Sequence, residues 1–97
     1  MPTYIALTSY TEQGIRTVKN APARLNAVKK QIKSMGGELK AFFLTMGPYD
    51  IVTIVDVPDD ETAAAIALAT GMGGNVRTVT MKAFNEGEFR KIIKALP

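Results

Sequence analysis

The sequence contains no cysteine and no histidine. Their absence excludes disulfides, thiolate nucleophiles and the usual zinc sites, and it removes the side chain best suited to proton transfer near neutral pH. No apolar run is long enough to cross a bilayer, and no basic segment followed by an apolar one opens the chain. We therefore expect a cytoplasmic protein with no membrane partner, and one that lacks the most common catalytic constellations.

The sequence also has no large excess of positive or negative charge, because its net charge is only +3 over 97 residues. The positive charge comes largely from two segments, one with Arg24, Lys29, Lys30 and Lys33 and the other with Arg90, Lys91 and Lys94. Lysines on solvated helix faces explain this mild basicity without a nucleic acid. The length predicts a single domain, residues 1–97, whose core is small enough to gain from burial against a partner subunit.

Four segments rich in β-branched and aromatic residues predict strands over residues 4–10, 39–46, 50–57 and 75–83. In the first, Ile5 and Leu7 are expected to face the core, with Tyr4, Thr8 and Tyr10 on the other side. The second and third strands are apolar on both faces, which is typical of strands that are covered on both faces.

Helices are predicted between these strands. Residues 21–35 carry an apolar stripe that ends at Gly36, and Asp59 is a suitable N-cap for a helix over residues 62–70. Ser9 and Glu12 have capping-box spacing ahead of a short helical turn over residues 11–19. A C-terminal helix is predicted to begin at a second capping box, formed by Asn85 and Glu88. Its apolar stripe consists of Phe89, Ile92, Ile93 and Leu96.

Two polar or glycine-rich clusters receive structural interpretations. The acidic run over residues 56–61 is better explained by helix capping than by a metal site. The glycines of residues 71–74 follow a helix, whereas a phosphate-binding loop leads into one. Neither cluster therefore predicts a metal or a cofactor.

The element order predicts an α+β fold of the ferredoxin-like βαββαβ type, with a four-stranded antiparallel sheet and a short C-terminal helix. The main helices would cover one face of the sheet. The other face would present either Phe42, Leu44 and Met46 or Phe43 and Ala41, together with residues of strand 50–57. Because monomers rarely expose so much apolar surface, we expect an obligate homo-oligomer, a dimer or an assembly of dimers, with sheets packed face to face.

Several short motifs carry a family resemblance over essentially the whole chain. They are Pro22-Ala23-Arg24, Gly47-Pro48-Tyr49-Asp50 after an apolar strand, Pro58-Asp59-Asp60, and Gly74-Asn75-Val76-Arg77-Thr78. In this order and spacing they resemble the GYD-domain family. The resemblance implies a ferredoxin-like domain of the dimeric α+β barrel type, often a stand-alone small bacterial protein. The family has no settled biochemical activity, so the resemblance implies no catalytic residue and no cofactor.

The first functional hypothesis is a homo-oligomer that binds a small apolar or aromatic molecule between facing sheets. Its candidate polar contacts are Tyr49 and Asp50, followed by Tyr10, Thr8, Arg77 and Arg24. The structural alternative is that Asp50 accepts backbone N–H bonds in the turn, and that the two arginines pair with Asp50 or with an aspartate at the start of the second main helix.

Two further classes remain as alternatives. One is a cofactor-independent enzyme, as in the small monooxygenases that share the dimeric barrel, with Tyr49 or Asp50 assisting proton transfer. The other is a nucleic-acid-binding module, because RNA-recognition domains share the element order. Those domains place stacking aromatics on the central strands, and strand 50–57 has none, so we expect no nucleic-acid partner.

Overall fold

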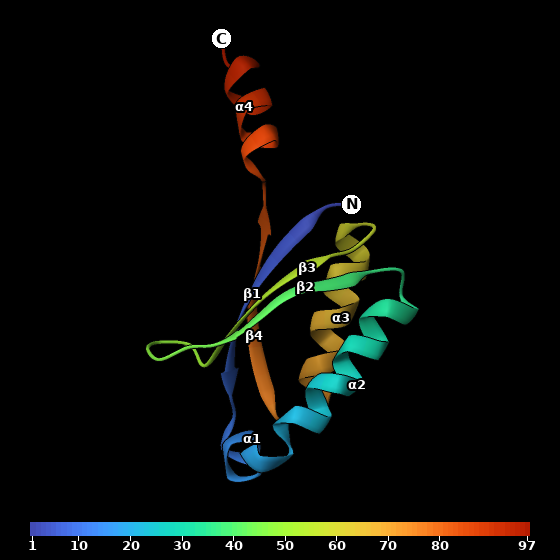
Figure 1. Ribbon diagram of the computed structural model, residues 1–97, viewed down its shortest axis with the longest axis vertical. Coiled ribbons are helices and arrows are strands. Elements are labelled where there is room, and N and C mark those ends of the chain that lie inside the picture. Colours follow the sequence, from blue (N-terminus) through green and yellow to red (C-terminus); the bar gives the residue numbers. More distant parts are fainter.

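The structure is a computed structural model that describes residues 1–97 (Figure 1). Its elements are β1 Thr3–Tyr10, α1 Glu12–Arg16, the 3₁₀ turn Val18–Asn20, α2 Ala21–Ser34, β2 Glu38–Leu44, β3 Ile51–Asp56, α3 Asp60–Met72, β4 Val76–Ala83 and α4 Glu86–Lys94. The four strands form one antiparallel sheet in the order β2-β3-β1-β4. The predicted α+β ferredoxin-like fold is confirmed. None of the helices is long and apolar enough to span a membrane.

The two main helices, α2 and α3, lie together on one side of the sheet, as Figure 1 shows. The apolar stripe predicted for α2 faces the sheet, because Leu25, Val28 and Ile32 are more protected than the neighbouring lysines. Only 7 of the 97 residues are buried, and α3 and α4 contribute none of them. The core of a single chain is therefore thin, and much apolar surface stays in contact with solvent.

The side of β1 that faces the helices is the opposite of the predicted one. Tyr4 and Thr8 are buried under the helices, whereas Ile5 and Leu7 lie on the other face. Alternation along a strand separates two faces but does not say which one the helices cover. Here Tyr4 and Thr8 are the buried residues of β1, and the Tyr4 hydroxyl finds a hydrogen-bond partner on α3. The prediction that Ile5 and Leu7 face the core was wrong.

Strand register defines the uncovered side of the sheet, which we call the open sheet face. Residues directly opposite each other in an antiparallel pair project to the same face. In β1, Ile5 lies opposite Ile54 of β3 and Met81 of β4, and Leu7 lies opposite Val52 and Val79 of the same two strands. In β2, Ala41 lies opposite Ile54, and Phe43 lies opposite Val52. Of the two predicted alternatives for β2, the set with Phe43 and Ala41 is therefore the uncovered one.

Local capping differs from the prediction at one helix. Thr11, not Ser9, caps α1: its hydroxyl accepts from Gly14 N at 3.1 Å, because β1 runs on through Tyr10 and keeps Ser9 in the strand. Gly14 allows α1 to lie against the start of β4, since a Cβ at this position would come within 1.9 Å of the Asn75 carbonyl oxygen. The predicted Asp59 cap and the predicted Asn85–Glu88 capping box are confirmed.

Candidate functional site

The turn between β2 and β3 is held to the rest of the sheet by Asp50. Its carboxylate Oδ2 accepts a hydrogen bond from Tyr10 N at 2.9 Å, and its own N–H donates to the Thr8 carbonyl at 2.9 Å. Thr45 N donates to the Asp50 carbonyl at 2.8 Å and closes the base of the turn. Asp50 therefore joins the β2–β3 hairpin to β1. The structural alternative was right that the carboxylate accepts a backbone N–H bond, but the donor lies in β1 and not in the turn.

Tyr49 lies beside Asp50 in the same turn, which extends away from the helices in Figure 1. The hydrogen bond that the structure shows at this residue is made by its backbone, because the Tyr49 carbonyl accepts from Thr45 Oγ1 at 2.7 Å. The turn also contains Gly47 at φ 142°, a conformation that favours glycine. The Tyr49 ring is half-buried, so part of it faces solvent.

The two candidate arginines do not form the predicted ion pairs. Arg24 donates to the carbonyl oxygens of Gly14 and Thr17, both at 3.2 Å, and to Thr17 Oγ1 at 3.0 Å, so it ties α2 to α1 and to the chain that follows it. The guanidinium of Arg77 lies beside Gly71, close to the C-terminal end of α3, where the helix dipole favours a cation. The ion pairs of the structure are Arg16–Glu12, Lys40–Glu38, Lys82–Asp60 and Arg90–Glu86.

Four of the six candidate residues are brought together at one end of the sheet. Thr8 and Tyr10 at the end of β1 are each hydrogen-bonded to Asp50 of the turn, and Tyr49 precedes Asp50 in the chain. Thr8 and Tyr10 belong to the helix-covered side of the sheet, since they alternate with Leu7 of the open sheet face. The cluster is thus mainly a connection between the hairpin and β1.

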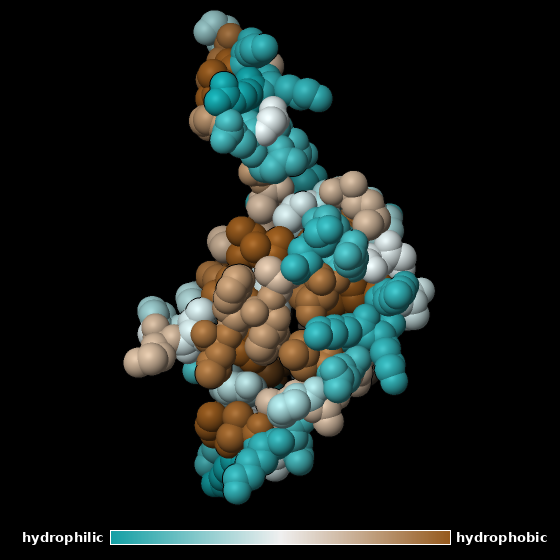
Figure 2. All heavy atoms as spheres, in the orientation of Figure 1, coloured by the Kyte–Doolittle hydropathy of each residue, from teal (hydrophilic) through white to brown (hydrophobic).

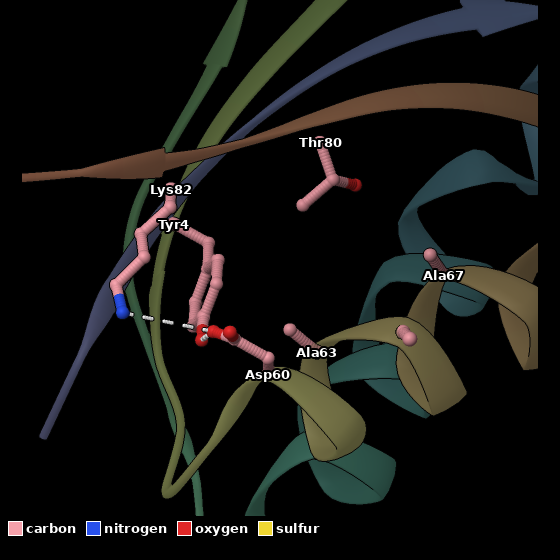
Figure 3. Close-up of a pocket in the computed structure, with 7 residues that line it drawn as sticks. Tyr4, Asp60, Ala63, Ala67, Thr80 and Lys82 are labelled. Atoms are coloured by element: carbon pink, nitrogen blue, oxygen red, sulfur yellow. Dashed lines mark hydrogen bonds and ion pairs between the residues drawn. The ribbon is translucent and has the colours of Figure 1, made fainter.

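A second polar cluster, which sequence reasoning missed, lies at the opposite end of the sheet (Figure 3). The Tyr4 hydroxyl donates to the carboxylate of Asp60, and Lys82 Nζ lies 3.8 Å from the same Asp60 Oδ1. The side chains come from β1, from the first turn of α3 and from β4. The element order contained this signal, because in a βαββαβ fold the start of α3 lies beside the start of β1 and the end of β4.

This cluster closes one end of a groove between α3 and β4, which we call the α3–β4 groove. It has a volume of about 260 Å³ and is lined by Tyr4, Asp60, Ala63, Ala64, Ala67, Thr80 and Lys82. The three alanines form one wall, and β4 forms the other with Thr80 and Lys82. The groove exists because α3 presents short side chains where it passes the edge strand of the sheet.

The electrostatics of the groove keep Tyr4 neutral. The hydrogen bond to Asp60, then burial, then the negative charges of Asp60, Asp59 and Glu61 raise the pKa of Tyr4 to about 12. A phenol held in this way donates a hydrogen bond and does not act as a base near neutral pH. The groove thus offers an apolar wall and a fixed polar end, which suits binding better than proton transfer.

The acidic side chains of residues 56–61 have different roles. Asp56 accepts a hydrogen bond from Thr3 Oγ1 at 2.6 Å. Asp59 accepts from the hydroxyl and the N–H of Thr62, and these bonds lower its pKa. Asp60 belongs to the groove, and no three acidic side chains of the protein gather in a way that could hold a metal ion.

Residues 4–93 match the GYD domain. The chain belongs to the GYD domain family. A relative from Thermus thermophilus, named "Glutamine synthetase and cystathionine beta-lyase binding protein", is 33% identical over 84 residues, which are 86% of this chain and 88% of the relative. The GYD domain described here therefore resembles, over almost its whole length, a protein named for binding two enzymes.

The Asp50 carboxylate of this GYD domain should contribute to stability. Asp50→Ala should lower the free energy of unfolding by about 1.5–3 kcal/mol, because the Tyr10 N–H loses a charged acceptor. Tyr49→Phe is the matched control, since it leaves the backbone bond to Thr45 intact and should change stability by less than about 0.5 kcal/mol. Urea denaturation measures both. Unchanged stability in Asp50→Ala would mean that the carboxylate does not anchor the turn.

The raised pKa of Tyr4 predicts a pH dependence of stability. The folded GYD domain holds the phenol proton more tightly than the unfolded chain, whose tyrosines titrate near 10. The stabilisation is therefore complete below about pH 10 and is lost as the pH rises through about 12. The midpoint temperature of thermal unfolding should fall more steeply across this range for the wild type than for Tyr4→Phe. Parallel curves would contradict the assignment.

Proposed function

We propose that this protein acts by binding other protein chains, first a second copy of itself across the open sheet face and then, as a homo-oligomer, a partner protein. The observation that carries the proposal is the open sheet face. Its apolar side chains come from all four strands, and Met81, for example, is 43% exposed although it lies within β4, opposite Ile5 of β1. Contiguous apolar surface of this kind is typical of protein interfaces.

Covering this face with an interface of standard size would favour association. A standard interface buries about 800 Å² per partner, which at about 25 cal/mol per Å² corresponds to roughly 20 kcal/mol per subunit. Loss of translational and rotational freedom opposes binding by about 4–15 kcal/mol. Antiparallel sheets meeting face to face can also interdigitate their side chains at about 10 Å separation, which suits the mixture of small and large residues on this face.

Support for a further protein partner comes from the relative's name and from the chemistry of the candidate residues. Asp50 and Arg24, the groups that a catalytic or ligand-binding hypothesis would use, are engaged with backbone atoms of the chain itself. The neutral Tyr4 of the α3–β4 groove is not a general base. An enzymatic role therefore has less support than a binding role.

A small apolar or aromatic molecule between facing sheets remains a second candidate. Its support is that two copies of the open sheet face would enclose an interior lined by aliphatic side chains and Phe43. A ligand mass that co-purifies with the oligomer in native mass spectrometry distinguishes this function from protein binding alone. Nucleic-acid binding has little support, because the central strands β1 and β3 present Ile5, Leu7, Val52 and Ile54 on this face and no stacking aromatic.

Association through the open sheet face can be tested by placing a charge in it. Met81→Glu should weaken self-association by more than about a hundredfold, because an unpaired buried carboxylate costs a few kcal/mol. Met46→Glu is the matched control: Met46 is fully exposed in the β2–β3 turn, so the same substitution should leave association unchanged. Sedimentation equilibrium measures both. Unaltered association of folded Met81→Glu would exclude the open sheet face as the contact.

The proposed partner class can be tested with the two enzymes that appear in the relative's name. The enzymes to test are glutamine synthetase and cystathionine beta-lyase from the organism that encodes this chain. At least one of them should bind the chain saturably when the chain is immobilised on a biosensor. An unrelated acidic protein is the control, because the chain carries a net charge of +3 and non-specific attraction is screened by salt. Equal binding to enzymes and control at about 0.3 M salt, or no binding, would contradict this partner class.

A further inference from the structure

The C-terminal helix α4 carries an apolar stripe with no partner in its own chain. Phe89, Ile92, Ile93 and Leu96 recur at helical spacing, and their exposed fractions lie between 44% and 60%. Figure 1 shows α4 standing clear of the sheet and of α2 and α3, and Figure 2 shows hydrophobic residues on one side of this projecting segment and hydrophilic residues on the other. A helix with such a stripe gains stability when the stripe is buried.

The connection to β4 directs α4 away from its own chain. Only Phe84 and Asn85 separate the end of β4 from the start of α4. Asn85 is extended at φ −72° and ψ 176°, and it is fixed by a complete capping box, in which Asn85 N donates to Glu88 Oε1 at 2.9 Å and Glu88 N donates to Asn85 Oδ1 at 2.8 Å. The helix therefore begins beyond the end of the sheet and projects away from α2 and α3 (Figure 1).

The α3–β4 groove has the shape and surface that such a helix requires. Its wall of Ala63, Ala64 and Ala67 lets another helix approach closely, because short side chains allow small interaxial distances. α3 has 13 residues, or about 20 Å, and α4 has 9 residues, or about 14 Å, so α4 fits along α3 within its length. The groove also borders β4, the edge strand, whose helix-facing side neither α2 nor α3 fully covers.

The charges of the two surfaces are complementary. Arg90 on α4 pairs with Glu86 at 2.8 Å, which leaves Lys91 and Lys94 as the cations of that helix without such a contact. The first turn of α3 carries Asp60, which lines the end of the groove and already contacts Tyr4 and Lys82, and Glu61, which is exposed beside it and forms no ion pair within the chain. A helix laid along the groove with its C-terminal half near this end would bring the lysines to the carboxylates, an arrangement that fixes direction as well as affinity.

We propose that α4 of one copy docks by its apolar stripe into the α3–β4 groove of a second copy, and that the exchange is reciprocal. Two copies related by a twofold axis would each receive the other's helix, as in other exchanges of a terminal element. This contact uses the helix-covered side of the chain and is separate from the open sheet face. Each copy then buries a surface that is exposed when the chain is alone.

The absence of cysteine from the sequence makes disulfide trapping a direct test. Ile92→Cys or Ile93→Cys in one copy is mixed with Ala64→Cys or Ala67→Cys in another copy that carries a mass tag. Mild oxidation should yield a mixed covalent dimer in at least one of the four pairings, because a disulfide forms readily only when the two Cα atoms come within about 7 Å. The tag separates the mixed dimer from same-variant products on a non-reducing gel.

Ala65→Cys provides the matched control, because it lies on α3 and is exposed but does not line the groove. The groove positions should trap the mixed dimer severalfold more than Ala65→Cys does. Equal trapping, or none, would overturn the proposal. So would an intrachain disulfide in a monomer that carries both Ile93→Cys and Ala64→Cys, since that result would place α4 in its own groove. Thermal unfolding of each reduced variant checks that the variant is folded. If one variant does not fold, the other pairings still test the contact.

Discussion

The structure depends on a sheet that has apolar residues on both faces and helices on only one. α2 and α3 cover the face that holds Tyr4, Thr8 and Ile51, and these are among the few residues that are buried. The opposite face, with Ile5, Leu7 and their cross-strand neighbours, has no cover within the chain. Burying apolar area is the dominant favourable term in folding and in association, so this imbalance favours the binding of another chain to the uncovered face.

Polar side chains in this fold mostly fasten one element to another. Asp50 joins the hairpin to β1, Arg24 joins α2 to α1, and Asp59 caps α3. Tyr4, Asp60 and Lys82 together connect β1, α3 and β4. Because these groups satisfy one another, the surfaces left for recognition are chiefly apolar: the open sheet face, the stripe of α4 and the alanine wall of α3. A protein with such surfaces is better suited to binding chains than to chemistry.

The sequence predicted most features that depend on local signals. The capping residues Asp59 and Asn85, the stripe of α2 and the element order follow from spacing alone, and the Gly47–Asp50 turn with its neighbouring motifs led to the GYD domain family, to which the chain belongs. The phase of β1 did not follow, because Ile5 and Tyr4 are both suited to burial and only the position of the helices decides between them.

Contacts between side chains that are far apart in the chain were the other feature that the sequence did not predict. The candidate residues around the turn lie together, but the partners expected for Arg24 and Arg77 were wrong, since backbone carbonyls and a helix end compete with carboxylates for a guanidinium. Tyr4, Asp60 and Lys82 are 56 and 22 residues apart along the chain, and no local pattern connects them. Only the topology brings these three side chains to one end of the α3–β4 groove.

Small-angle X-ray scattering on purified protein at micromolar concentration tests the central claim, that the open sheet face is covered by a second copy. The single chain has a Cα radius of gyration of 14.6 Å. Our account predicts that the wild type has a forward-scattering mass of at least two chains and a radius of gyration clearly above this value, and that folded Met81→Glu has a lower mass. A wild-type mass of one chain, or an unchanged mass in folded Met81→Glu, would contradict it.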